Sequence, residues 1–379
     1  MKLTLQREQL LKPLQLVIGA VDHKQAMPIL ANVLLDLNDK QLSVTGTDLE
    51  IELIGQSVLT HAQSPNTRLT LPARKLMDIC KALPESASIE LYRDDNDRIV
   101  LKSGRSRFTM SLMSADDFPA VESSEANVTF SISQQELSTL LHRTAFAMAQ
   151  QDVRYYLNGM LFEISDNQLR VVATDGHRLA MNQINIGVET RFIASHPVAS
   201  AGRLQVIIPY KAVMELMRLL KDADKTLTVH VGQHHIRVLS DDFIFTSKLV
   251  EGRFPEYQRV IPKMGDKQIL IDRDVLKQAL LRTAILCHDK RGVQFELSAG
   301  VLKLSANNPA HDAAEEEIDV NYSGEPLDVG FNITYLLDVL QVVKAGPVRL
   351  TLIDSNSSMR IDEPGNEDQG TFVVMPMRL

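Results

Sequence analysis

An aspartate and a histidine two residues apart, Asp175 and His177, stand in the stretch VVATDGHRLA directly after an apolar run. With a nucleophile, such a pair could transfer protons in a catalytic triad, and with further ligands it could hold a metal ion. The nearby sequence has no GxSxG nucleophile elbow and no cysteine placed as a nucleophile. An enzyme would therefore need partner residues from distant segments. The alternative is a turn whose aspartate bonds to backbone amides.

The elements that must position this pair form a threefold repeat along the 379 residues. Amphipathic helix patterns cover residues 7–20, 133–150 and 272–287, and a second set covers residues 72–83, 209–221 and 332–344. Paired strands with a tight turn follow each first helix, and further strands follow each second helix. We therefore predict an α+β chain of three similar domains, at 1–125, 126–263 and 264–379, called here the first, second and third repeat.

The repeat favours a turn at Asp175. The positions of Thr174, Asp175 and Gly176 are occupied by Thr47, Asp48 and Leu49 in the first repeat and by Asn307, Asn308 and Pro309 in the third. All three sets suit a turn, because Asp and Asn side chains bond to nearby backbone. His177 and Arg178 stay unexplained, because the other repeats have different residues there.

The distribution of charge along the sequence is compatible with DNA as a partner. A formal net charge of -8 would argue against nucleic acid if the charge were spread evenly. The six predicted helices together carry a small positive charge, so the acidic excess lies elsewhere. That segregation is expected if one surface faces a polyanion. The alternative is that Lys and Arg are placed to suit helix dipoles.

Cysteine usage and the first residues indicate a compartment. Cys80 and Cys287 lie in helical patterns, without CxxC or Cys/His spacing that would bind a metal. Arg7, Glu8 and Lys12 interrupt the first apolar residues, and no apolar run reaches the length of a membrane span. We therefore expect a cytoplasmic protein that needs no cofactor and no metal, and that does not enter membranes.

Three further segments each allow two interpretations. QDVRYYLNG sets Arg154 beside two tyrosines, which can contact phosphate and stack on bases or lie buried in a strand. VVMPMRL, from Val373, is either a final edge strand or a surface that binds partners. AAEEEID, around Glu316, is either a solvated acidic face or the complement of SGRSRF in a second chain, which would be a head-to-tail association.

Several long motifs in one order, among them LLKPLQ, PILANVLL, TGTDLE, SGRSRF, QDVRYYLNGMLFE, VATDGHRLA, GRFPEYQRV and VVMPMRL, resemble the family of bacterial DNA polymerase III beta subunits over essentially the whole chain. The resemblance implies a replicative sliding clamp, which is not an enzyme. Two chains would form a head-to-tail ring around duplex DNA, with helices lining the hole and antiparallel sheets outside. Partners would be DNA of any sequence, the replicative polymerase, the clamp loader, and other polymerases and repair proteins. The rival is a partner-binding scaffold that never encircles DNA.

The resemblance also implies site residues. Contact with DNA would involve Lys24, Arg74, Gln151, Arg154, Tyr155, Tyr156 and Lys211. The partner groove would comprise Leu157, Thr174, Gly176, His177, Arg178, Leu179, Pro255, Arg259, Val260, Tyr335, Ser358, Val373, Met375, Pro376, Met377 and Arg378. The dimer interface would use Arg105, Arg107, Ile285 and Leu286, with Glu315, Glu316 and Glu317 opposite the arginines. Three features depart from the family pattern, namely Gln150, Tyr210 and a longer connection at 187–202, to which no function is assigned.

Overall fold

The computed structural model describes residues 2–21, 27–121, 125–165, 167–188, 203–262, 265, 267–287, 291–366 and 369–378, without the side chains of 61–65. The chain divides into two compact units. The first holds the described residues of Met1–Gln135, Gly187–Ala194 and Met214–Leu249, and the second holds those of Glu136–Ile186, Ser195–Val213 and Val250–Leu379.

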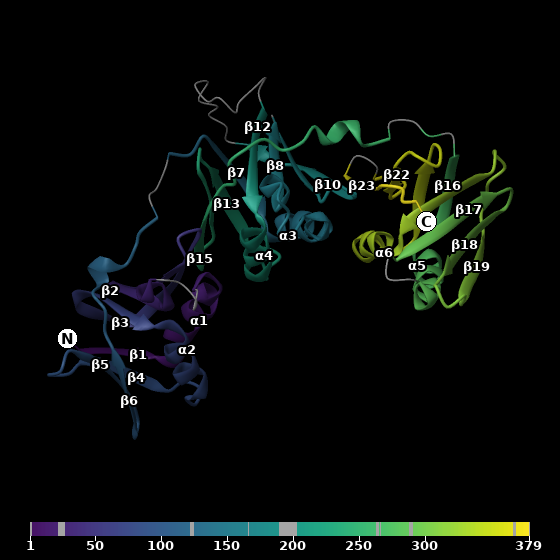
Figure 1. Cartoon of the computed structure of the whole chain (residues 1–379). Coiled ribbons are helices and arrows are strands. Elements are labelled where there is room, and N and C mark those ends of the chain that lie inside the picture. The colour runs from purple at the N-terminus through teal and green to yellow at the C-terminus, as the bar shows by residue number, and fades with distance from the viewer. Residues whose placement is uncertain are drawn as a thin grey trace. The chain divides into compact units, whose positions relative to one another are not determined.

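The three repeats share the general order strand, helix, strands, helix and three strands, with different numbers of described strands between the helices (Figure 1). The first contains β1 (Lys2–Gln6), α1 (Arg7–Val17), η1 (Ile18–Ala20), η2 (Pro28–Ala31), β2 (Asn32–Thr47), β3 (Ile51–Pro72), α2 (Ala73–Ala82), β4 (Ser88–Arg93), β5 (Arg98–Ser103), β6 (Ser106–Ser111) and η3 (Ala115–Asp117). The second contains β7 (Val128–Ser133), α3 (Gln134–Thr144), η4 (Ala145–Ala147), η5 (Tyr155–Leu157), β8 (Gly159–Ser165), β9 (Gln168–Thr174), β10 (Arg178–Asn185), β11 (Gly187–Val188), β12 (Arg203–Pro209), α4 (Tyr210–Leu219), β13 (Thr226–Val231), β14 (His235–Leu239), β15 (Phe243–Lys248) and η6 (Tyr257–Arg259). The third contains β16 (Lys267–Asp272), α5 (Arg273–Thr283), η7 (Ala284–Leu286), β17 (Gly292–Ser298), β18 (Val301–Asn307), β19 (Ala313–Asp319), β20 (Leu327–Asn332), α6 (Ile333–Val342), β21 (Pro347–Leu352), β22 (Met359–Asp362) and β23 (Gly370–Val374).

The predicted helices are all present, with differences at their ends. Each first helix is shorter than its pattern, because its last turn tightens into a 3-10 helix, as in η1, η4 and η7. A short strand that the helix pattern did not predict opens every repeat, as β1, β7 and β16. In the first repeat the paired strands are β2 and β3, with the tight turn between Thr47 and Ile51. Strand β2 also contains a bulge at Asp39, whose φ is 53°.

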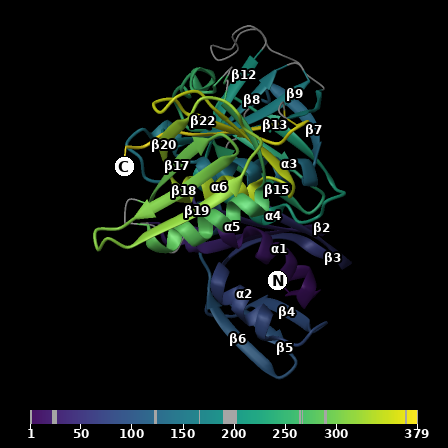
Figure 2. The ribbon, with the colours of Figure 1, turned by 90° about the vertical axis from the view of Figure 1, so that its right-hand side faces the viewer.

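The described residues form four antiparallel sheets. The first unit holds the sheets β1-β4-β5-β6 and β11-β7-β13-β14-β15-β3-β2, and the second holds β12-β8-β9-β10-β23-β22-β21-β16 and β19-β18-β17-β20. Helix α1 packs on β3 beside α2, while α5 lies along β18 and β19 beside α6 (Figures 1 and 2). The leucines at equivalent helix positions are nearly or fully buried, namely Leu10, Leu14, Leu141, Leu276 and Leu280. Within the described residues, no helix has both the length and the apolar character needed to span a membrane.

Neighbouring repeats are joined in one register. The last strand of the second repeat, β15, pairs with β3, which sets Ser247 opposite Ile51. The last strand of the third repeat, β23, pairs with β10, which sets Val374 opposite Arg178. The backbone bond beyond each pair also recurs, because Lys248 N donates to the carbonyl of Glu50 at 2.9 Å and Met375 N donates to that of His177 at 2.8 Å. The equivalent strands β6 and β19 are edges of their sheets.

Candidate functional site

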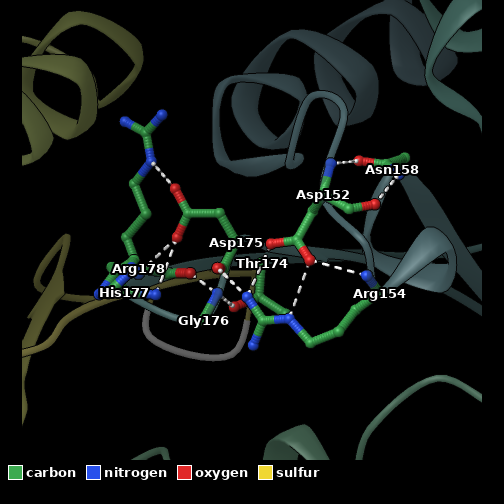
Figure 3. A network of polar contacts seen from close by, with 8 residues as sticks. All are labelled: Asp152, Arg154, Asn158, Thr174, Asp175, Gly176, His177 and Arg178. Atoms are coloured by element: carbon green, nitrogen blue, oxygen red, sulfur yellow. Dashed lines mark hydrogen bonds and ion pairs between the residues drawn. The ribbon is translucent and has the colours of Figure 1, made fainter.

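The Asp175 segment is a turn, as the repeat predicted. Asp175 Oδ1 accepts hydrogen bonds from the backbone N–H groups of His177 and Arg178 at 2.9 and 3.0 Å (Figure 3). Thr174 Oγ1 accepts from Gly176 N at 3.1 Å and donates to the carbonyl of Arg178 at 2.7 Å. Gly176 has a φ of 89°, a conformation that favours glycine. The aspartate is therefore occupied by backbone donors.

The first repeat makes the same bonds. Asp48 Oδ1 accepts from Glu50 N at 2.9 Å and from Ile51 N at 2.7 Å. Thr47 Oγ1 accepts from Leu49 N at 3.0 Å and donates to the carbonyl of Ile51 at 2.8 Å. The turn is thus a property of the repeat. Across the described part of the chain, no three His, Cys, Asp or Glu side chains gather in a way that could hold a metal ion.

Arg178, which the repeat left unexplained, ties β10 to α6. Its Nε donates to Asp175 Oδ2 at 3.1 Å, and its Nη1 forms an ion pair with Asp338. Its Cζ lies 4.6 Å from the ring centre of Tyr335 and 5.3 Å from that of Phe146. The His177 ring stacks on Tyr335 with centroids 6.4 Å apart. The second and third repeats are therefore joined by side chains as well as by the sheet.

A cavity of about 190 Å³ opens beside this junction and is called here the β10–β23 pocket. Nine of the predicted groove residues line it, namely Leu157, Thr174, Gly176, Arg178, Leu179, Pro255, Val260, Val373 and Met375. Leu157, Leu179 and Val373 are at most 2% exposed and form its floor. Arg178 and Glu256 place charge at its walls. The pocket can therefore take an apolar side chain and offer polar contacts around it.

The other predicted groove residues lie outside this lining, namely His177, Arg259, Tyr335, Ser358, Pro376, Met377 and Arg378. Ser358 Oγ donates to the carbonyl of Val260 at 3.0 Å and so fixes a lining residue. Met377 N donates to the carbonyl of Gly330 at 2.8 Å. Arg259 forms an exposed ion pair with Glu256.

The VVMPMRL segment both packs and lines the pocket. The interpretation as an edge strand was wrong, because β23 has β10 on one side and β22 on the other. Val373 and Val374 are therefore at most 1% exposed. Met375, just beyond the strand, is 36% exposed at the pocket.

Sequence reasoning missed two lining residues, Glu256 and Tyr257. They belong to the FPEY run beside Pro255, which was the available signal. Tyr257 is 4% exposed and its hydroxyl donates to Glu163 Oε1 at 3.3 Å. Glu163 is itself buried and accepts from Arg170 Nη1 at 2.7 Å and from Gln205 Nε2 at 2.6 Å. Burial raises the pKa of Tyr257, and the donor Arg170 opposes that shift. A buried polar network thus anchors one wall of the pocket.

The residues predicted to contact DNA fall into two groups. Arg74 on α2, Lys211 on α4, Gln151 and Tyr155 are exposed. Arg154 and Tyr156 line the β10–β23 pocket. Lys24 lies outside the described residues. Among the departures from the family pattern, Gln150 Nε2 donates to the Tyr210 hydroxyl at 3.0 Å, and residues 189–202 are likewise outside the description.

Arg154, which lines the pocket, is held by acceptors within the chain. Its Nε and Nη2 donate to the two carboxylate oxygens of Asp152 at 3.0 and 2.8 Å, and Nη2 also donates to the carbonyl of Asp175 at 3.1 Å (Figure 3). The Arg154 guanidinium lowers the pKa of Asp152 to about 2. The cation is therefore paired within the chain.

The residues predicted for a dimer interface lie mostly at the surface. Arg105 and Arg107 are exposed at the β5–β6 turn and on β6, and Ile285 is 77% exposed on η7. Leu286 is half-buried. Two of the three glutamates on β19 already have partners in the chain. Arg282 binds Glu316 with two bonds of 2.6 and 2.7 Å, and Lys303 lies 2.9 Å from Glu315.

Family models of the DNA polymerase III beta subunit match three consecutive parts of the chain. The N-terminal domain matches residues 1–122, the central domain 131–256 and the C-terminal domain 258–378. The beta sliding clamps of Pseudomonas putida and Escherichia coli are 52% and 47% identical, with 100% of each chain covered. The crystal structure of the DNA polymerase III subunit beta from Pseudomonas aeruginosa is 50% identical with a TM-score of 0.93, and Caulobacter crescentus pol III beta is 33% identical with a TM-score of 0.91; both cover 100% of each chain.

Proposed function

Since this chain belongs to the DNA polymerase III beta subunit family, we propose that it works in the cytoplasm as a head-to-tail homodimeric ring around duplex DNA, with the β10–β23 pocket as its docking site. The chain is a DNA sliding clamp of replication and a processivity factor, not an enzyme. DNA, a polymerase and a second copy of itself are the partners that the family implies. Domain boundaries at 1–125, 126–263 and 264–379 are part of the proposal.

The observation that carries the docking function is the composition of the pocket. Two repeats and the connection between them converge on a floor of buried leucine and valine, with Met375 at the opening. An apolar side chain that fills such a floor provides most of the affinity of a short peptide. We therefore expect polymerases, the clamp loader and repair proteins to insert a peptide with apolar anchors. Tethering through the ring would add to a modest affinity.

Contact with DNA is proposed for the exposed cations Arg74 and Lys211, together with Gln151 and Tyr155, and for Lys24. Contacts to phosphate position a protein without reading sequence, which suits sliding. Arg154 and Tyr156 line the pocket, so we propose that they serve the boundary between DNA and partner binding.

The internal junctions predict how two copies meet. At both, the strand that follows the Asp48 or Asp175 turn of one repeat pairs with the last strand of the next repeat, in the same register. The third repeat leaves the equivalent strand, β19, at a sheet edge, and the first repeat leaves its last strand, β6, at another. A second chain that continued the pattern would join β19 of one copy to β6 of the other. Unpaired strand edges are templates for such pairing.

The register can be transferred residue by residue. Ala313 in the third repeat is equivalent to Leu179 in the second, because Ala313 pairs with Asn307 as Leu179 pairs with Thr174. On the other side, Phe108 on β6 is equivalent to Phe372 on β23, because the two occupy the same position in their hairpins. Because Ala180 faces Phe372, Ala314 should face Phe108 of the second copy. Counting onward along both strands, Glu315 meets Arg107 and Glu317 meets Arg105. Opposite charges thus fall on opposite residues, which sets orientation, while Ile285 and Leu286 supply apolar area.

The test is retention on nicked circular plasmid. The protein is loaded with a clamp loader and ATP, the complex is washed in high salt, and the DNA is then linearised. Electrostatic binding is lost at the salt step on either topology. We expect the protein to survive the wash on the circle and to leave after linearisation. Salt-sensitive binding that ignores free ends, with loading verified on a control clamp, would favour the scaffold that never encircles DNA.

A further inference from the structure

The junction between the first and second repeats holds a cavity of about 290 Å³ that is the counterpart of the β10–β23 pocket, and it is called here the β3–β15 cavity. Phe118-Pro119-Ala120-Val121 form its wall, as Pro255 and Tyr257 of the FPEY run form that of the pocket. Its inner surface uses equivalent strand positions. Glu52 faces Thr246 across the junction, as Leu179 faces Val373 in the pocket.

The chemistry of the two places differs. Where the pocket has the buried pair Leu179 and Val373, the cavity has Glu52 and Thr246. It also contains two arginines, Arg68 and Arg237, over an apolar floor that includes Ile54. The cavity thus occupies the place equivalent to the β10–β23 pocket and has a mixed lining instead of an apolar one. An apolar anchor alone would leave its polar groups without partners, which is costly.

Arg237 has unused hydrogen-bonding capacity. Its Nε is buried, and no group in the described part of the chain accepts from it. The equivalent arginine of the third repeat, Arg360, also has a buried Nε with no hydrogen-bond acceptor among the described residues, but it lies 3.0 Å from Asp362 in an ion pair. Leu239 stands where that aspartate would be in the second repeat, because Leu239 faces Ile244 as Asp362 faces Thr371. The second repeat therefore offers Arg237 no carboxylate at this position, and its buried Nε can still donate to one.

The other charged groups at the cavity have contacts of their own. Arg68 lies 3.5 Å from Asp36 in an ion pair that is about half exposed on both sides. Glu52 Oε2 accepts from Val121 N at 3.2 Å and so holds the connection between repeats. Burial raises the pKa of Glu52, and the charge of Arg237 opposes that shift, so Glu52 is the carboxylate in the cavity that a ligand would compete with.

We propose that the β3–β15 cavity is a second peptide-binding site, which takes an acidic segment of a partner protein, with an apolar side chain on the floor at Ile54 and a neighbouring carboxylate on Arg237. Charge complementarity selects this ligand over the purely apolar anchors expected at the β10–β23 pocket. Two sites of different chemistry on one chain would let two partners bind together.

The test uses two capped tetrapeptides, one with the order glycine, leucine, glutamate, glycine and its twin with glutamine for glutamate. Binding to the full chain is followed by methyl NMR of Ile54 and of Met375, which report the cavity and the pocket separately. We expect the acidic peptide to shift the Ile54 signal in a saturable manner and the neutral twin to bind roughly tenfold more weakly or not at all. Perturbation of Met375 alone, or equal binding of both peptides, would overturn the proposal.

Two variants make the test specific. Arg237→Met keeps the apolar stem and removes the charge, so it should weaken the acidic peptide by roughly tenfold or more. Glu52→Gln keeps an acceptor for Val121 N and removes the competing carboxylate, so it should strengthen binding. Arg98→Met, an exposed arginine on β5 of the same unit, is the matched control. If Arg237→Met fails to fold, a peptide affinity that is unchanged or lower in Glu52→Gln still contradicts the proposal. Plasmid retention does not depend on either outcome.

Discussion

The Arg178 guanidinium lies over the Tyr335 ring, with Cζ 4.6 Å from the ring centre, so a strand of the second repeat and a helix of the third are fastened by a cation on an aromatic face. The same guanidinium pairs with Asp175 and Asp338, and its side chain is only 13% exposed. One residue therefore stabilises the turn, the junction and a wall of the β10–β23 pocket at once.

Arg178→Ala should lower the free energy of unfolding by about 2–4 kcal/mol, because two largely buried carboxylates lose their cation and two rings lose a stacked partner. Urea unfolding measures the change. Arg259→Ala is the matched control. Its ion pair with Glu256 is 81% and 72% exposed, so the cost should stay within about 0.5 kcal/mol. Equal costs for the two variants would contradict the role given to Arg178.

Tyr257→Phe should weaken peptide binding at the β10–β23 pocket more than it lowers stability. The variant keeps the ring in the wall and loses the bonds of the hydroxyl with Glu163 and Arg170, which costs about 1 kcal/mol of stability. Glu163→Ala should cost about 3 kcal/mol, since it leaves Arg170 buried without its carboxylate. Fluorescence polarisation of a labelled peptide and urea unfolding separate the two effects. Glu256→Ala, at an exposed glutamate of the same wall, is the control. If Glu163→Ala were as stable as this control, the buried network would not anchor the wall.

Acid should release Arg154 only at very low pH. The pKa of Asp152 is lowered to about 2 in the folded protein. The stabilisation that the ion pair contributes is therefore fully present above the pKa of the unfolded chain, and it is lost as the pH falls through about 2. NMR titration of the Asp152 carboxylate checks the value. Asp152→Asn frees the cation at neutral pH and should raise the affinity for DNA while the salt dependence steepens. A carboxylate that titrates near 4 would mean that the ion pair does not persist in solution.

Cys80 should resist alkylation in the folded protein. Burial raises the pKa of its thiol to about 12, so almost no thiolate is present at pH 8. Cys287 is only partly buried, and burial raises its pKa as well. Mass spectrometry after iodoacetamide treatment should find Cys287 modified before Cys80, and both modified in urea. Rapid native labelling of Cys80 would show that α2 opens locally.

Charge reversal tests the register proposed for the dimer. Arg105→Glu alone should weaken the dimer, because it brings like charges opposite each other, and Glu317→Arg added to it should restore association. The pair Arg107→Glu with Glu317→Arg, which the register does not place opposite each other, is the control and should not recover. Sedimentation velocity over a concentration series measures the dissociation constant. Equal rescue by both pairs would favour a general charge effect over a fixed register.

The sequence predicted the repeats and their helices, because apolar residues recur at helical spacing around leucines such as Leu10 and Leu276 that the fold buries. It did not predict β1, β7 and β16, because each is five or six residues long and runs directly into a helix. Nor did it place Tyr257, whose burial depends on Glu163, 94 positions away. Resemblance to the family predicted many residues of the β10–β23 pocket. The ion pair of Arg282 with Glu316 could not be predicted, because it depends on how α5 packs on β19 and no pattern in either segment indicates that packing.

The connection from Val250 to Val260 is both a link between two repeats and a wall of a pocket. Val250 N donates to Ile207 at one end, Val260 accepts from Ser358 at the other, and Tyr257 is buried between them. Surface connections ordinarily tolerate insertions and deletions. Here a single added residue would shift Pro255 and Tyr257 against the floor. Among relatives, this connection should therefore vary in composition but hold its length, and a fusion or insertion placed there should cost partner binding before it costs folding.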